Sequence, residues 1–251
     1  MSDGLSIVWP ALVAGLLITA THVPLGMQVL RRGIVFIDLA VAQIAGLGVV
    51  LADFMGFEPH GVAVQVAALA AAIAGALLLN WTDKIWAEVQ EAVIGVTFIV
   101  AANLAILLLA SNPHGAEHLK DLLVGQILWV SPSVLGYVAL VYAGLLVVWF
   151  RYGERIGRAG FYLLFALAVT VSVQLVGLYL VFTTLIVPAL ATRSLAQYRL
   201  AWAYALGVVG YGAGIGASLA SDLPPGPLVV CCMTALGVAA ALMSPRYPSP
   251  R

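Results

Sequence analysis

Asp38 is a charged side chain in a stretch of sequence that is otherwise apolar. It lies six residues after Arg32, so at ~1.5 Å per residue it would sit roughly 9 Å into a helix that begins there. A charged side chain at bilayer depth is costly and usually serves transport or ion coupling. We therefore expect Asp38 to contact a cation.

The segment from His114 to His118 reads His-Gly-Ala-Glu-His. It matches the H-x-x-E-H pattern of inverted zinc peptidases, in which both histidines share one helical face and bind zinc. Pro113 precedes the pattern and Gly115 interrupts it, which favours a short solvated loop over a helix and argues against a peptidase. Two interpretations stay open: a plain solvated loop, or a loop in which His114, Glu117 and His118 collect cations before entry.

The apolar run from Val176 to Arg193 contains a proline, Pro188. Proline removes a backbone donor and clashes with the preceding turn, so at bilayer depth it needs protein or water around it rather than lipid. The run could be an ordinary kinked membrane helix. Alternatively, it is a broken helix that forms part of a gate, with Thr183, Thr184 and Pro188 at the break.

The composition decides the class of protein that must position these residues. Of 251 residues, 63% are hydrophobic and only 9% are charged, far outside the range of soluble domains. Eleven basic residues balance eleven acidic ones, so no global field attracts nucleic acid. The sequence contains no G-x-x-x-x-G-K-[ST] phosphate loop, and any ATPase that drives it would be another polypeptide.

A membrane span needs roughly 20 apolar residues, and eight stretches meet this criterion, with seven to nine crossings possible. They are Ile7–Leu30, Ile34–Gly56, Gly61–Trp81, Ala92–Ser111, Ser133–Phe150, Phe161–Phe182, Leu200–Ser221 and Leu228–Met243. Two further pieces, Leu122–Val130 and Thr183–Ala191, are too short to cross alone. Basic residues gather after the first, fifth and eighth stretches and at 193–199, which places these ends in the cytoplasm and the N-terminus outside.

The phrase V-G-x-x-L-V-x-x-x-L-I-V-P-A-x-A-x-R, at 176–193, resembles a signature of the membrane subunits of metal-ion ATP-binding-cassette importers, the zinc, manganese and iron permease family. Further pieces agree with that family in order and spacing. They are Pro24-Leu-Gly26 followed by Arg31-Arg32, Asp38 to Gly48, Glu91-Ala-Val-Ile-Gly95 and Leu123-Val-Gly-Gln-Ile-Leu128. The resemblance spans most of the chain.

In the resembled family, the second helix carries an aspartate followed four residues later by a histidine, and the two handle the metal. Aligned on Gly48, this chain has Leu39 and Gln43 at those positions, with Asp38 one residue earlier. Glutamine is a weaker ligand than imidazole for zinc or manganese. Either the site has been lost or retuned, or His22 provides the nitrogen.

His22 lies nine residues before Arg31, so in a hairpin of the first two helices its depth would fall between those of Asp38 and Gln43. The other interpretation is a histidine that is only hydrogen-bonded between helices near Pro24. Small residues in the Leu200–Ser221 stretch, including Gly210, Gly212, Gly214 and Gly216, indicate tight helix packing or a dimer seam.

The resemblance also implies an ATPase-docking segment between two spans. The matching segment is Arg151–Gly160, which is shorter than the family pattern. Within it, Arg151, Glu154, Arg155 and Arg158 would meet the ATPase.

Glu91 matches an acidic residue of the family's fourth span, or is only a helix N-terminal carboxylate. Gln126 replaces an aspartate that is common in the family.

We therefore predict an all-α, polytopic transmembrane helical bundle of the importer-permease type, with residues 1–251 as one domain. The resemblance implies a permease subunit of an importer for a divalent transition metal ion, zinc or manganese, in the bacterial inner (plasma) membrane. It would not be an enzyme and would hold no cofactor, and Asp38, His22 and Gln43 would contact the transported ion. Its partners would be a separate ATPase, a secreted metal-binding protein, membrane lipid and a second copy of itself, but no nucleic acid. The alternative is a self-contained secondary carrier or channel for a cation with Asp38 as its coupling group.

Overall fold

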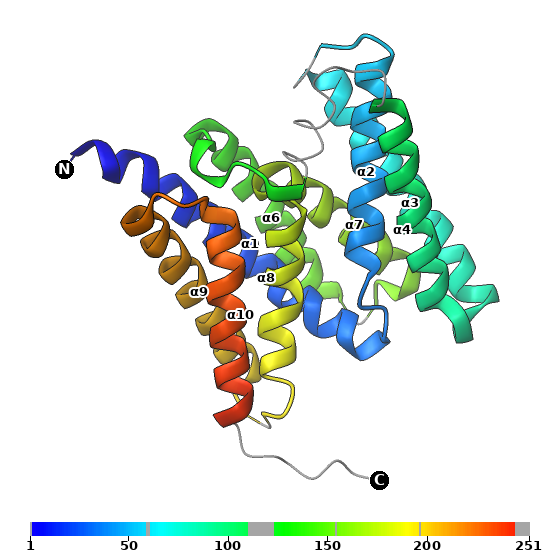
Figure 1. The fold of residues 1–251 in the computed structure, drawn as a ribbon. Helices are drawn as coiled ribbons and strands as arrows, with labels where there is room; N and C mark the ends of the chain where they lie inside the picture. The colour runs from blue at the N-terminus through cyan, green and yellow to red at the C-terminus, as the bar shows by residue number, and fades with distance from the viewer. Residues whose placement is uncertain (1, 59–60, 110–122, 154, 196, 244–251) are drawn as a thin grey trace. The chain divides into compact units, whose positions relative to one another are not determined.

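The fold is all-helical throughout the part of the chain that the structure describes (Figure 1). This computed structural model describes residues 2–58, 61–109, 123–153, 155–195 and 197–243, with side chains from Val8 onward. Its α-helices are α1 (Ser2–Arg32), α2 (Ile37–Phe54), α3 (Val62–Ile85), α4 (Gln90–Leu109), α6 (Pro132–Tyr152), α7 (Gly157–Val176), α8 (Leu178–Ala191), α9 (Arg199–Ser221) and α10 (Pro225–Met243). Two short 3₁₀ turns, η1 (Ala87–Val89) and η2 (Ile127–Trp129), complete these elements.

Eight helices among the described residues are long and apolar enough to cross a membrane. They are every α-helix named above except α8, which has 14 residues. At ~1.5 Å per residue α8 is about 21 Å long, less than the ~30 Å hydrocarbon core of a bilayer. The predicted polytopic helical fold with eight spans is confirmed, while the predicted orientation of the N-terminus stays a prediction.

The chain forms two compact units, each with its own packing. Unit 1 comprises Met1–Arg32, Gln126–Tyr142 and Leu175–Arg251, and unit 2 comprises Gly33–Gly125 and Ala143–Gln174. That the whole chain acts as a single domain stays a prediction.

Unit 1 is built on close contacts among α1, α8, α9 and α10. Val23 and Met27 of α1 pack with Ala189 of α8 and Ala203 of α9 in one buried cluster. Gly26 faces the backbone of α8 so closely that an added Cβ would overlap the carbonyl of Leu185. The glycine that sequence analysis noted beside Pro24 therefore permits this approach of α1 to α8.

The glycines of α9 divide between two faces. A Cβ at Gly210 would meet Met233 of α10 at 2.9 Å, and one at Gly214 would overlap the backbone of Val229. A Cβ at Gly212 or Gly216 would meet nothing within 4 Å. Helix packing inside unit 1 therefore accounts for the pair Gly210 and Gly214, and the other pair lies on the opposite face of the helix.

Unit 2 is organised around α2, which packs against both α3 and α4. Val50 of α2 contacts Ala105 and Leu109 of α4 in a buried cluster. A Cβ at Gly48 would lie 2.7 Å from the carbonyl oxygen of Ala67, so this glycine allows close contact with α3.

A buried hydrogen-bond network joins α3, α4 and α7 in unit 2. The side-chain amide of Gln90 donates to the carbonyl of Leu79 at 2.9 Å and lies 3.4 Å from the hydroxyl of Tyr162. Thr82 donates to the side-chain oxygen of Gln90 at 3.1 Å. Because buried polar groups are costly when unsatisfied, this network fixes the junction between α3 and α4.

The break in the 176–193 run falls at Gly177, and the predicted helix Phe161–Phe182 is therefore wrong in its C-terminal boundary. Gly177 has φ 84° and ψ 160°, a backbone conformation that only glycine adopts readily. Pro188 lies inside α8, which continues to Ala191, so the helix break predicted at Thr183, Thr184 and Pro188 is wrong. Pro188 is buried, which agrees with the prediction that protein or water, rather than lipid, surrounds it.

Candidate functional site

His22 is fully buried in α1 of unit 1. Its Nδ1 lies 3.1 Å from the carbonyl oxygen of Ile18 and 2.9 Å from the hydroxyl of Thr21. The ring is tilted against that of Tyr142 in α6, with centroids 6.4 Å apart. These contacts hold the imidazole in one orientation.

The contact with Ile18 favours one tautomer of His22. A carbonyl oxygen can only accept a hydrogen bond, so in this contact Nδ1 carries the proton, which puts the lone pair of the neutral ring on Nε2. Metal-binding histidines are commonly oriented in this way, by a hydrogen bond from the nitrogen that does not bind the metal. The arrangement suits a ligand and equally suits a hydrogen-bonded structural histidine, so the two interpretations of His22 both stand.

Asp38 is fully buried in the first turn of α2 in unit 2. Neither carboxylate oxygen accepts a hydrogen bond of ordinary geometry from a described group. The amides of Asp38 itself and of Leu39 act on the carboxylate, as expected at a helix N-terminus. A buried carboxylate whose two oxygens both lack a hydrogen-bond partner among the described groups is uncommon. This agrees with the prediction that Asp38 interacts with a cation.

Gln43 lies on the same helix as Asp38 but on another face. Five residues separate them, which turns their directions by roughly 140° at ~100° per residue. Gln43 is half-buried, whereas Asp38 is fully buried. Ion contact by Gln43, like that by His22, stays a prediction.

Glu91, at the start of α4, reaches the start of α2 in the same unit. One of its carboxylate oxygens accepts a hydrogen bond from the backbone amide of Phe36 at 3.2 Å, while the other is buried without a partner among the described groups. The charge of Glu91 also acts on Asp38. The sequence indicated either a family acidic position or a carboxylate at the N-terminus of its own helix for Glu91, and neither interpretation predicted this connection to α2.

The predicted gate residues lie on α8 in unit 1. Thr183 donates to the carbonyl of Tyr179 at 2.8 Å, and Thr184 donates to that of Leu180 at 2.7 Å. The hydroxyl of Thr184 also lies 3.0 Å from that of Tyr211 in α9, so a polar contact links the two helices. A role for Thr183, Thr184 and Pro188 in gating stays a prediction.

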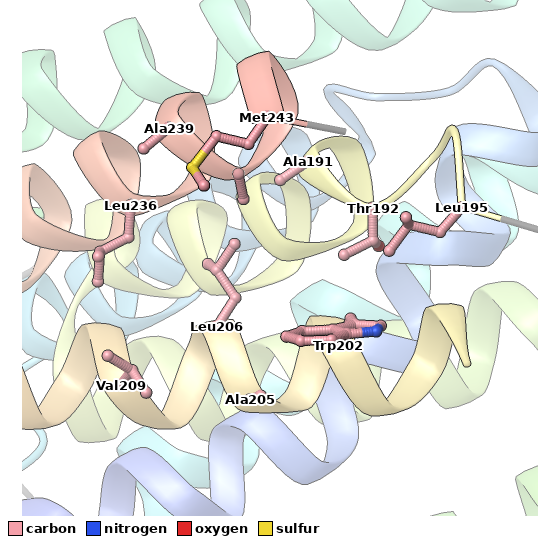
Figure 2. A pocket seen from close by; sticks show the side chains of 11 residues that line it. Ala191, Thr192, Leu195, Trp202, Ala205, Leu206, Val209, Leu236, Ala239 and Met243 are labelled. Carbon is pink, nitrogen blue, oxygen red and sulfur yellow. The ribbon is translucent and has the colours of Figure 1, made fainter. Parts of the chain in front are cut away.

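An apolar pocket of about 580 Å³ lies among the C-terminal end of α8, α9 and α10 of unit 1 (Figure 2). Trp202 and Leu206 of α9 line it, together with Leu236 of α10 and Thr192 of α8. The hydroxyl of Thr192 already donates to the carbonyl of Pro188 at 2.8 Å. No lining residue carries a charge, so this pocket does not suit a metal ion.

The predicted docking segment connects α6, which ends at Tyr152, to α7, which begins at Gly157. Arg151 and Arg155 are exposed. Arg158 pairs with Asp83, with 3.2 Å between Nε and the carboxylate oxygen. Arg158 is thus already engaged within unit 2, whereas Arg155 is presented to solvent.

Four predicted site residues lie outside the described residues: His114, Glu117, His118 and Glu154. Among the residues that are described, no three His, Cys, Asp or Glu side chains gather as a metal-binding group. The site residues that sequence analysis proposed therefore do not form one compact ligand cluster within either unit.

Comparison with known proteins gives a match along nearly the whole chain. The profile of the ABC 3 transport family matches residues 5–154 and 154–244. The high-affinity zinc uptake system membrane protein ZnuB of Haemophilus influenzae is 24% identical over 254 residues, which cover 92% of this chain and 95% of that protein.

Two solved structures share the fold. PsaBC from Streptococcus pneumoniae in complex with Fab has a TM-score of 0.78 at 17% identity, covering 97% of this chain and 95% of that one. An inward-facing structure of a metal-chelate type ABC transporter has a TM-score of 0.67 at 14% identity, covering 94% and 85%. At these identities the two structures establish the fold of the chain.

Proposed function

This chain belongs to the ABC 3 transport family, and we propose that it is the permease subunit of an ATP-binding-cassette importer for a divalent transition metal ion. The observation that carries the proposal is the end-to-end similarity to ZnuB, named for zinc uptake, over 92% of this chain. The eight apolar helices provide the multi-pass membrane protein that such a subunit requires. Its location is the bacterial inner membrane.

Zinc is the first candidate for the transported ion, and manganese is the second. The name of the relative favours zinc. The buried imidazole of His22, with its lone pair on Nε2, offers the nitrogen donor that zinc accepts readily. Asp38 offers the negative charge that compensates a divalent cation, and Gln43 offers a weaker oxygen donor. These three residues are the proposed contacts of the ion along its path.

The energy source is a separate ATPase subunit, because this sequence has no phosphate-binding loop of the G-x-x-x-x-G-K-[ST] type. The segment between α6 and α7 is the proposed docking element, with exposed Arg151 and Arg155 available for contact. A second copy of this chain and a secreted metal-binding protein complete the proposed complex. The subunit itself would not be an enzyme and would hold no resident cofactor.

A self-contained secondary carrier is the less favoured function. Such a carrier would couple transport to a proton or cation gradient through Asp38. Membership of an ABC transport family favours the ATP-driven subunit instead. A gene for a Walker-type ATPase beside the gene for this chain would further support that choice.

Reconstitution tests the proposal directly. The chain, co-expressed with the ATPase encoded beside it, should form a complex in liposomes that accumulates radioactive zinc or manganese when ATP and the binding protein are supplied. Asp38→Ala should remove this uptake while leaving assembly intact. ATP-independent uptake by the chain alone would refute the importer subunit and favour the secondary carrier.

A further inference from the structure

Asp38 and Glu91 together place three carboxylate oxygens in unit 2 that are buried and have no hydrogen-bond partner among the described groups. Two belong to Asp38, and the third is Oε2 of Glu91. The remaining oxygen of Glu91 accepts the amide of Phe36 at 3.2 Å. Since Phe36 precedes α2 and Asp38 lies in its first turn, both carboxylates lie at the same end of α2.

Helix capping explains only part of this arrangement. Carboxylates are favoured near the N-terminus of a helix, and Glu91 satisfies one amide there. The backbone amides of Asp38 and Leu39 also act on the Asp38 carboxylate, and that of Val35 acts on Glu91. None of them makes a hydrogen bond of ordinary geometry to the other three oxygens. The side chain whose charge acts on Asp38 is Glu91. Glu91 is also a carboxylate, so the two groups repel each other when both are ionised. Buried ionised groups persist when a counter-charge or a metal ion compensates them.

We propose that Asp38 and Glu91 form a binding site for a hard divalent cation at the N-terminal ends of α2 and α4. The cation would bridge the two carboxylates, and water and backbone carbonyl oxygens would complete its coordination. Two carboxylates supply a charge that matches a divalent ion. Glu91 is only half-buried, so the ion enters from its side, while Asp38 forms the closed end.

The chemistry of the donors selects the class of ion. Carboxylate, carbonyl and water oxygens suit magnesium, calcium and manganese, whereas zinc and copper prefer sites with imidazole or thiolate. No group of three His, Cys, Asp or Glu residues surrounds the pair among the described residues. The site is therefore an oxygen-only one, and Mn²⁺ is a suitable probe.

This site differs from the ligand arrangement that sequence analysis placed on α2. There the ligand positions were Leu39 and Gln43, four residues apart along one helix, whereas Asp38 pairs with a residue on α4. The inference shares Asp38 with the proposed function and rests on it for its place in transport, but the binding of a cation can be measured without transport.

The experiment measures Mn²⁺ binding to the full chain, purified in detergent together with its ATPase, by loss of the electron paramagnetic resonance signal of free Mn²⁺. The wild type should bind one ion per chain at this site. Asp38→Asn and Glu91→Gln should each weaken binding at least about tenfold, and the double variant should abolish it. Asp53→Asn, at the other end of α2, and Glu88→Gln, exposed just before α4, are matched controls that should bind as the wild type does.

Thermal unfolding keeps the test decisive if a variant folds poorly. Mn²⁺ should raise the Tm of the wild type and of both controls but not that of the double variant, since a ligand stabilises only the state that binds it. A wild type that binds no Mn²⁺, or a double variant that binds like the wild type, overturns the site. Absence of ATP-driven uptake together with the expected binding pattern would refute the proposed function and leave this site standing.

Discussion

Arg158 and Asp83 form an ion pair with 3.2 Å between Nε and the carboxylate oxygen, and Arg158 also donates to the backbone carbonyl of Asp83 at 3.1 Å. The pair joins the first turn of α7 to the last residues of α3 within unit 2. Two bonds from one guanidinium fix its direction more firmly than a single surface ion pair would. Arg158 therefore has a structural role, whatever its contribution to docking.

The exposed Arg155 is consequently the cleaner test of ATPase docking. Arg155→Glu should weaken association with the ATPase several-fold, because the docking face would change its charge. The measurement is co-purification of the two subunits together with ATP turnover of the complex. Unchanged association and turnover would remove the segment between α6 and α7 from the docking interface.

A charge swap controls for the structural role of Arg158. Arg158→Glu alone should reduce stability, because it places two carboxylates together. Adding Asp83→Arg restores opposite charges at the same place. If the swapped variant regains stability but not ATPase association, Arg158 itself contacts the ATPase; recovery of both would assign it a structural role only.

The second prediction concerns the break between α7 and α8. Gly177→Ala forces a side chain into a conformation with φ 84° and ψ 160°, at a cost of about 1–3 kcal/mol. Thermal unfolding in detergent should show this loss. Gly144→Ala in α6 is the control, because a Cβ there would meet nothing within 4 Å. A Gly177→Ala protein as stable as the control would mean that the break is relaxed in the membrane.

The sequence predicted the membrane helices well and the break poorly, for related physical reasons. A span is specified by a long apolar run, which is visible residue by residue. A glycine inside such a run is common in membrane helices and does not by itself mark a break. Pro188 was the stronger local signal, yet α8 continues beyond it.

The contact between Glu91 and Phe36 could not be predicted from the sequence, because the two residues are 55 positions apart. The sequence identified Asp38 as a charged residue in an apolar stretch, and Glu91 as a family acidic position or a helix N-terminal carboxylate. Only the packing of α2 against α4 reveals that Glu91 reaches the helix of Asp38. In contrast, the buried state of Pro188 followed from the backbone donor that proline lacks, and the structure confirms it.

The third prediction uses the two faces of α9. Gly214→Ala should destabilise unit 1 by about 1–3 kcal/mol, since its Cβ would overlap the backbone of Val229. Gly212→Ala should be neutral or stabilising by up to about 1 kcal/mol, because alanine is the better helix former and the added Cβ meets nothing. The Tm of Gly214→Ala should therefore fall below that of the wild type, while the Tm of Gly212→Ala should equal or exceed it. A loss of stability in Gly212→Ala would indicate that a second chain packs on that face.

The last prediction concerns His22 and the residue beside it. If His22 binds the transported ion through Nε2, His22→Ala should abolish ATP-driven uptake, and Gln43→His in that background should restore part of it.

The hydroxyl of Thr21 lies 2.9 Å from Nδ1 of His22 and would orient the ring, so Thr21→Val should weaken apparent metal affinity by about 10–100-fold. Thr97→Val is the matched control, because the hydroxyl of Thr97 donates to the carbonyl of Val93 in its own helix α4, at 2.8 Å. The readout is the metal concentration that gives half-maximal uptake, with folding checked by gel filtration. Normal uptake by His22→Ala alongside complete loss in Asp38→Ala would make His22 a packing residue and leave the ion to oxygen ligands, which would favour manganese over zinc.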